Sequence, residues 1–99
     1  MRRDEFGSWL GNRMSKRPVS DYLSRCQRVE KGLNIDLDEE FSKDSGKRLL
    51  SELEYSRADQ ENGKVIPKGL VFSKGADLYN GMSSLKAAVK AYFEYCRII

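Results

Sequence analysis

Residues 78–99 read LYNGMSSLKAAVKAYFEYCRII, and this stretch decides the fold. Its large apolar residues recur at alternating spacings of four and three, which is the pattern of a long helix that packs along a seam. These residues are Leu78, Met82, Leu85, Val89, Tyr92 and Cys96. The pattern predicts a long C-terminal helix, and Gly81 marks a position at which that helix could split.

A second face of the same segment carries mostly small residues, which allow another helix to approach closely. Its members are Ser84, Ala88, Ala91 and Tyr95. This face has two interpretations. Either the helix occupies the centre of a bundle, or Ala88, Ala91 and Tyr95 form an interface with a partner or with a second copy of the chain.

Two helices are expected before residue 35. Apolar residues within 3–14 recur at helical spacing, which predicts a short amphipathic helix. The run Ser15-Lys16-Arg17-Pro18 indicates a break and a restart, because the residue before proline avoids the helical conformation and proline suits a first turn. We expect Ser15 or Arg17 at the N-cap of the second helix. Its end is expected at 32–34, where Gly32 permits a left-handed turn.

The middle of the chain predicts shorter elements. Residues 36–41 should form a helical turn whose acidic side chains face solvent. A leucine-rich helix follows, which Asp44 or Ser45 can cap. Arg48 and Glu52 should form an i, i+4 ion pair on the surface of that helix.

The leucine-rich helix should fade near residues 56–59, and residues 59–75 are the least helical part of the chain. Asn62-Gly63 is a turn signal, and short β-prone stretches flank Pro67. These features predict a long loop or a small β-hairpin at about 59–75. We therefore predict an all-α fold in which residues 1–99 form a single helical domain, a compact bundle of four or five helices.

Composition argues against most enzyme classes. The 99 residues include no histidine, which is the commonest general base and metal ligand. Cys26 and Cys96 fall in phase with the apolar helix stripes, so we expect them to be core thiols rather than a disulfide. The acidic run 36–40 lacks the glycine of a calcium loop, and residues 45–48 lack the Ser/Thr of a phosphate-binding loop. We predict no catalytic residue, no metal site, no cofactor and no enzymatic activity.

The chain shows neither a secretory signal nor an apolar run of the ~20 residues that a membrane span needs. We therefore expect a cytoplasmic protein without a membrane partner.

Charge is distributed unevenly along the chain. Residues 1–33 carry eight basic against four acidic residues, residues 34–63 carry four against nine, and residues 64–99 carry six against two. Basic residues concentrated at the two ends suggest contact with a nucleic acid. The candidate DNA-binding residues are Lys16, Arg17, Arg25, Arg28 and Lys31 on the second predicted helix, and Lys86 and Lys90 on the last.

Three stretches carry a resemblance to a known family. Phe6-x-x-Trp9-Leu10, the run SKRPVSDYLSR at 15–25 and the closing pattern of apolar residues at 85–93 resemble the SAM-like core-binding domain of tyrosine recombinases and phage integrases. The resemblance implies a bundle of about four helices that grips duplex DNA from one side. Pro18 departs from the threonine usual in the family, and the 59–75 segment is longer and more β-prone than the family predicts.

The same resemblance implies a role for particular basic residues. The basic contacts of the family map onto Lys16, Arg17, Arg25 and Arg28. The recombinase chemistry uses an Arg, His and Tyr set in a separate domain, and this chain has no histidine, so strand cleavage by that route is not expected.

The sequence thus supports two hypotheses from different classes. The first is a small non-catalytic DNA-binding protein that contacts mainly the phosphates of double-stranded DNA. The alternative is a protein–protein interaction module, such as a phage or mobile-element inhibitor that docks on a host protein or nucleoprotein complex, with the acidic block 36–40 meeting a basic surface. A homodimer formed through Ala88, Ala91 and Tyr95 is a third option.

Overall fold

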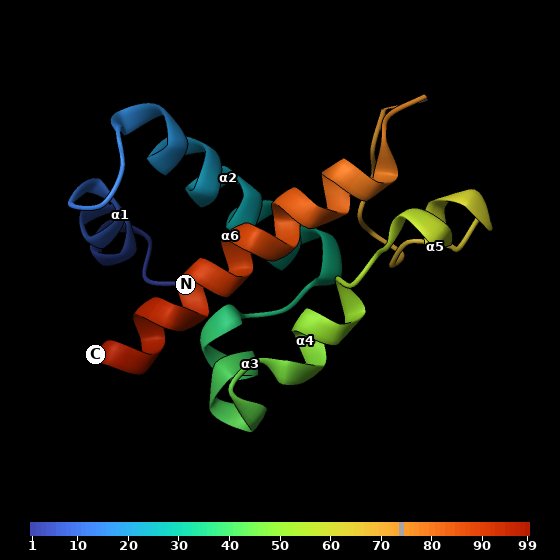
Figure 1. Cartoon of the computed structure of the whole chain (residues 1–99). Helices are drawn as coiled ribbons and strands as arrows, with labels where there is room; N and C mark the ends of the chain where they lie inside the picture. Colours follow the sequence, from blue (N-terminus) through green and yellow to red (C-terminus); the bar gives the residue numbers. More distant parts are fainter. Residues whose placement is uncertain (74) are drawn as a thin grey trace.

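The computed structural model of the chain describes residues 1–73 and 75–99 and confirms the all-α fold. In chain order the helices are α1 (Arg3–Gly11), α2 (Lys16–Leu33), α3 (Leu37–Asp44), α4 (Lys47–Glu52), α5 (Arg57–Glu61) and α6 (Leu78–Ile98) (Figure 1). The described part of the chain therefore has six helices instead of four or five. It contains no strand, so of the two alternatives predicted for 59–75, a long loop or a small hairpin, the described residues after α5 form a loop. Residue 74 of that segment lies outside them.

Helix α6 is the central element of the bundle. It packs against each of the other five helices, with α2 on one side and α3 and α4 on the other (Figure 1). Ala88 and Tyr95 of the small-residue face are both buried within the chain. The central interpretation of this face is thus correct, and the predicted partner interface through Ala88 and Tyr95 lacks an exposed surface in this structure.

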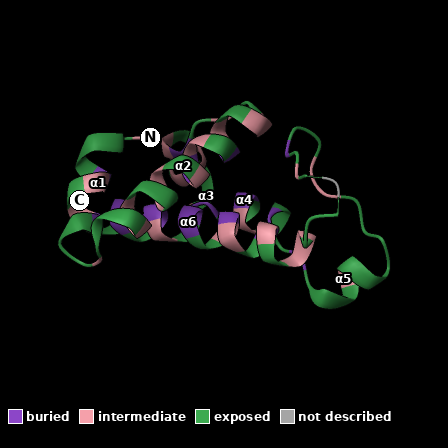
Figure 2. Cartoon of the chain, turned by 90° about the horizontal axis from the view of Figure 1, so that it is seen from above, coloured by how far each residue is buried: buried purple, intermediate pink, exposed green. Residues whose placement is uncertain are grey.

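Aromatic side chains fasten α1 to α6. Phe6 of α1 is fully buried, and its ring meets that of Tyr92 edge to face with 4.9 Å between centroids. On the same side of α6, the ring centroids of Trp9 and Tyr95 are 5.7 Å apart. On the other side of α6, Phe93 packs 5.8 Å from Phe41 of α3. Such edge-to-face and tilted pairs add to the free energy of burial itself. The buried positions accordingly gather on α6 and on the helices that face it (Figure 2).

The ends of α2 agree with the sequence at one terminus and differ at the other. Ser15 is the N-cap, as predicted. At the C-terminal end the left-handed residue is Asn34, with φ 54°, whereas Gly32 remains inside the helix. Gly32 is needed for space, because a Cβ there would lie 2.8 Å from the carbonyl oxygen of Gly69. The prediction that Gly32 makes the turn is therefore wrong.

The junction between α3 and α4 is capped by Asp44. Its carboxylate accepts hydrogen bonds from the backbone N–H of Gly46, at 3.0 Å, and of Arg48, at 2.9 Å. Arg48 also pairs with Glu52 at 3.4 Å, which confirms the predicted i, i+4 contact. Helix α4 ends at Glu52, earlier than predicted.

The loop after α5 is attached to the bundle at Leu70 and Phe72. Leu70 is buried, and Phe72 lies against Gly81 of α6, where an added Cβ would come within 2.5 Å of its ring. Helix α6 therefore runs unbroken through Gly81, which provides the space for Phe72.

Both cysteines are free thiols in the core, as predicted. Burial raises the pKa of Cys26 to about 12, and it also raises the pKa of Cys96. Burial therefore disfavours the thiolate form of both cysteines.

None of the helices in the described residues is long and apolar enough to cross a membrane.

Candidate nucleic-acid interface

The outward face of α2 carries a line of basic side chains. Arg17, Arg28 and Lys31 lie at spacings of eleven and three residues, which place them on one stripe of the helix, and all three are exposed. Lys16 is exposed beside them, whereas Arg25 is half-buried to one side. At 1.5 Å per residue the stripe from Arg17 to Lys31 is about 21 Å long. We call the exposed residues Lys16, Arg17, Arg28 and Lys31 the α2 basic face.

The basic residues of α2 are among the many described cations that form no ion pair, as are Arg3, Arg13 and Arg57 elsewhere in the chain. Within residues 1–73 and 75–99, neither the α2 basic face nor Arg25 forms an ion pair. Other cations do, and the pairs are Lys43–Glu40, Arg48–Glu52, Lys64–Asp59 and Lys86–Glu54. No carboxylate forms a direct ion pair with these side chains among the described residues, and Asp21 is the exposed carboxylate that lies on the same stripe, four residues after Arg17.

The first turn of α2 adds to this positive potential. Ser15 makes no side-chain capping bond, and the turn contains no acidic residue. The free backbone N–H groups of an 18-residue helix favour an anion at that end, and Lys16 and Arg17 lie there.

Arg28 has a structural role that its spacing did not reveal. Its guanidinium lies 4.5 Å above the centroid of Phe72, and it donates a hydrogen bond to the carbonyl oxygen of Val71. It thus holds the loop against α2. The contact joins residues 43 apart in the chain, so helical periodicity carries no signal for it.

Lys86 and Lys90 do not belong to the same surface as α2. They line a hollow together with Lys47, Leu50 and Glu54, on the α4 side of α6, and Lys86 forms an ion pair with Glu54. Helix α2 lies on the opposite side of α6 (Figure 1). The seven predicted DNA-binding residues therefore form two separate surfaces.

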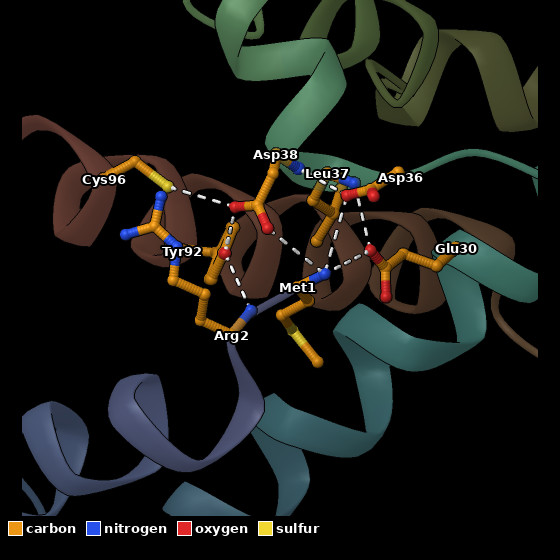
Figure 3. A network of polar contacts seen from close by, with 8 residues as sticks. All are labelled: Met1, Arg2, Glu30, Asp36, Leu37, Asp38, Tyr92 and Cys96. Atoms are coloured by element: carbon orange, nitrogen blue, oxygen red, sulfur yellow. Dashed lines mark hydrogen bonds and ion pairs between the residues drawn. The ribbon is translucent and has the colours of Figure 1, made fainter.

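A polar network around Met1 joins four segments of the chain (Figure 3). The Met1 ammonium lies 3.1 Å from Glu30, 3.5 Å from Asp36 and 3.5 Å from Asp38. Burial opposes this positive charge, but the hydrogen bond to Glu30 and the three carboxylates outweigh it and raise the pKa of the Met1 ammonium. Glu30 also accepts a hydrogen bond from the backbone N–H of Leu37, at 3.0 Å.

The same network reaches α6 through Tyr92. The buried Tyr92 hydroxyl donates to Asp38 and accepts from the backbone N–H of Arg2, at 3.0 Å (Figure 3). Burial, followed by the hydrogen bond to Asp38, raises the pKa of Tyr92. Asp36 and Asp38 thus form contacts within the fold, and the Asp36 side chain remains 49% exposed.

The α2 basic face presents positive charge to solvent. Among the residues that the structure describes, no group of three or more Cys, Asp and Glu side chains is arranged to hold a metal ion. Ala91 is half-buried, and it is the most accessible of the three residues predicted as a partner interface.

Comparison with protein-family models, with curated proteins and with solved structures finds no match to this chain.

Proposed function

We propose that this protein is a non-catalytic DNA-binding protein that contacts the phosphates of duplex DNA through the α2 basic face. The observation that carries the proposal is the clustering of charge on one helix: Lys16, Arg17, Arg28 and Lys31 are all exposed on α2, and none of them forms an ion pair among the described residues. The resemblance of residues 6–25 to a recombinase core-binding domain supports the same helix.

Phosphate contacts of this kind give affinity without strong sequence choice. Each phosphate that a side chain neutralises contributes about −0.9 to the slope of log K against log salt concentration. Lys16, Arg17 and Lys31 together should therefore account for a slope of about −3. Arg28 is anchored to the loop, so its removal would perturb the fold as well as the charge.

The experiment measures fluorescence anisotropy of a labelled duplex of about 20 to 30 base pairs, long enough for several phosphate contacts, and of the matching single strand. The variant Lys16→Gln/Arg17→Gln/Lys31→Gln, here the α2 triple variant, replaces three cations by a neutral polar side chain and so removes three charges. We expect duplex binding by the wild type and a loss of about tenfold or more in the variant at low salt.

The matched control is Lys47→Gln/Lys86→Gln/Lys90→Gln, here the groove triple variant, which removes the same net charge from the α4–α6 side. It should bind duplex like the wild type. Equal loss in both variants would mean that affinity follows net charge alone, and an unchanged α2 triple variant would show that α2 is not the contact surface.

The alternative, a protein interaction module, rests on the uneven charge along the chain more than on the small-residue face of α6. Ala88 and Tyr95 are buried, and Asp36 and Asp38 bind Met1.

A further inference from the structure

A groove runs along the seam between α4 and α6. It consists of two adjoining hollows of about 460 and 420 Å³, which share Glu54, Lys86 and Lys90. Lys47 and Leu50 border the first hollow, and Ala87 borders the second. We call this surface the α4–α6 groove.

The charge of the α4–α6 groove favours an acidic ligand. Its lysines are Lys47, Lys86 and Lys90, and its one carboxylate is that of Glu54. Lys86 already pairs with that carboxylate, which shows that the groove accommodates a carboxylate–ammonium contact. The Glu54 side chain is 61% exposed and can turn toward solvent, so an incoming carboxylate could replace it on Lys86.

The uncharged lining favours a peptide over a nucleic acid. Single-stranded nucleic acids bind through aromatic rings on which the bases stack. Here Arg57 covers one face of Tyr79, 4.6 Å from the ring centroid, and Tyr55 is buried with its hydroxyl donating to a backbone carbonyl. Leu50 is half-buried and Ala87 is exposed, so both can contact apolar side chains.

We propose that the α4–α6 groove binds an acidic peptide segment of a partner protein. Carboxylates of the segment pair with Lys47, Lys86 and Lys90, and its apolar side chains lie on Leu50 and Ala87. Helix α4 lies on the other side of α6 from α2 (Figure 1), so the α4–α6 groove and the α2 basic face are separate surfaces. This inference does not depend on DNA binding.

The test uses the whole protein and a labelled helical peptide composed of glutamate, leucine and alanine. Two further probes are a peptide with lysine in place of each glutamate and a labelled single-stranded oligonucleotide. Anisotropy at low salt should show binding of the acidic peptide and no binding of the basic one. Three exposed ion pairs are together worth about a tenfold change in affinity, so the groove triple variant should lose about that much.

The α2 triple variant is the matched control, and it should bind the acidic peptide like the wild type. Circular dichroism checks that each variant is folded. Absence of acidic-peptide binding, or equal binding in the groove triple variant, overturns the proposal. Oligonucleotide binding that is lost in the groove triple variant also overturns it, because the groove would then be a nucleic-acid site. None of these results depends on whether duplex binds to α2.

Discussion

The hydroxyl of Tyr92 should contribute substantially to the free energy of unfolding. It is fully buried, donates to the Asp38 carboxylate and accepts from the backbone N–H of Arg2. Tyr92→Phe keeps the ring on Phe6, with which it packs edge to face, and removes only the oxygen.

The magnitude follows from the two lost partners. A hydrogen bond to a charged group contributes about 1.5–3 kcal/mol, and a buried donor left without a partner adds to the loss. We therefore expect Tyr92→Phe to lower the free energy of unfolding by about 2–3 kcal/mol. For a domain of this length a loss of about 2 kcal/mol lowers Tm by about 8–16 °C.

The assay is urea unfolding followed by circular dichroism, with Tyr55→Phe as the matched control. The Tyr55 hydroxyl donates to the neutral carbonyl of Lys64 at 2.7 Å, so its loss should cost about 1 kcal/mol. If Tyr92→Phe destabilises the protein no more than Tyr55→Phe does, the assigned contribution of Asp38 is refuted.

Three further predictions concern the loop contact, a thiol and an amine. Gly69→Ala should lower the free energy of unfolding in urea by about 2 kcal/mol or more. The reason is that Gly69 has φ 102° and that an added Cβ would collide with the carbonyl oxygen of Gly32. A loss under about 0.5 kcal/mol would contradict this close approach. Cys26, whose pKa is raised to about 12, should react with a thiol reagent only as fast as the protein unfolds, and burst labelling of the native protein would refute its burial. The raised pKa of the Met1 ammonium gives stability that is fully present below pH 8.0 and lost as the pH rises through the folded pKa. The free energy of unfolding should therefore fall as the pH rises above 8 in the free-amine protein and not in an N-acetylated one. Equal pH profiles would contradict the ion pairs.

Local sequence patterns predicted the helices that have long apolar stripes. The spacing of apolar residues predicted the extent of α6. The break before Pro18 predicted that α2 begins after its N-cap Ser15. Helix α5 was missed although a local signal exists. Ser56 and Asp59 form a capping box, which is a sequence-level sign of a helix start, within the segment where the previous helix was expected to fade.

The periodicity of apolar residues could not predict contacts between segments that are distant in the sequence. A glycine near the end of a helical stripe is usually interpreted as the helix end, and Gly32 was interpreted in this way. Its actual reason is the close approach of the Gly69 backbone, which the local sequence does not show. Arg28 looked like a free cation because its partners lie in the loop at residues 71–72. The basic residues form two surfaces because of the way α2 and α4 pack around α6. Counting charges along the chain gives no information about this packing.

The salt dependence of duplex binding tests the central claim most directly. Anisotropy titrations of the wild type and the α2 triple variant across a salt series give the slope of log K against log salt concentration for each. The account predicts a wild-type slope of about −3 or steeper, and a slope that is shallower by about 2.7 in the variant. Equal slopes in the two proteins, or no duplex binding by the wild type at low salt, would contradict it.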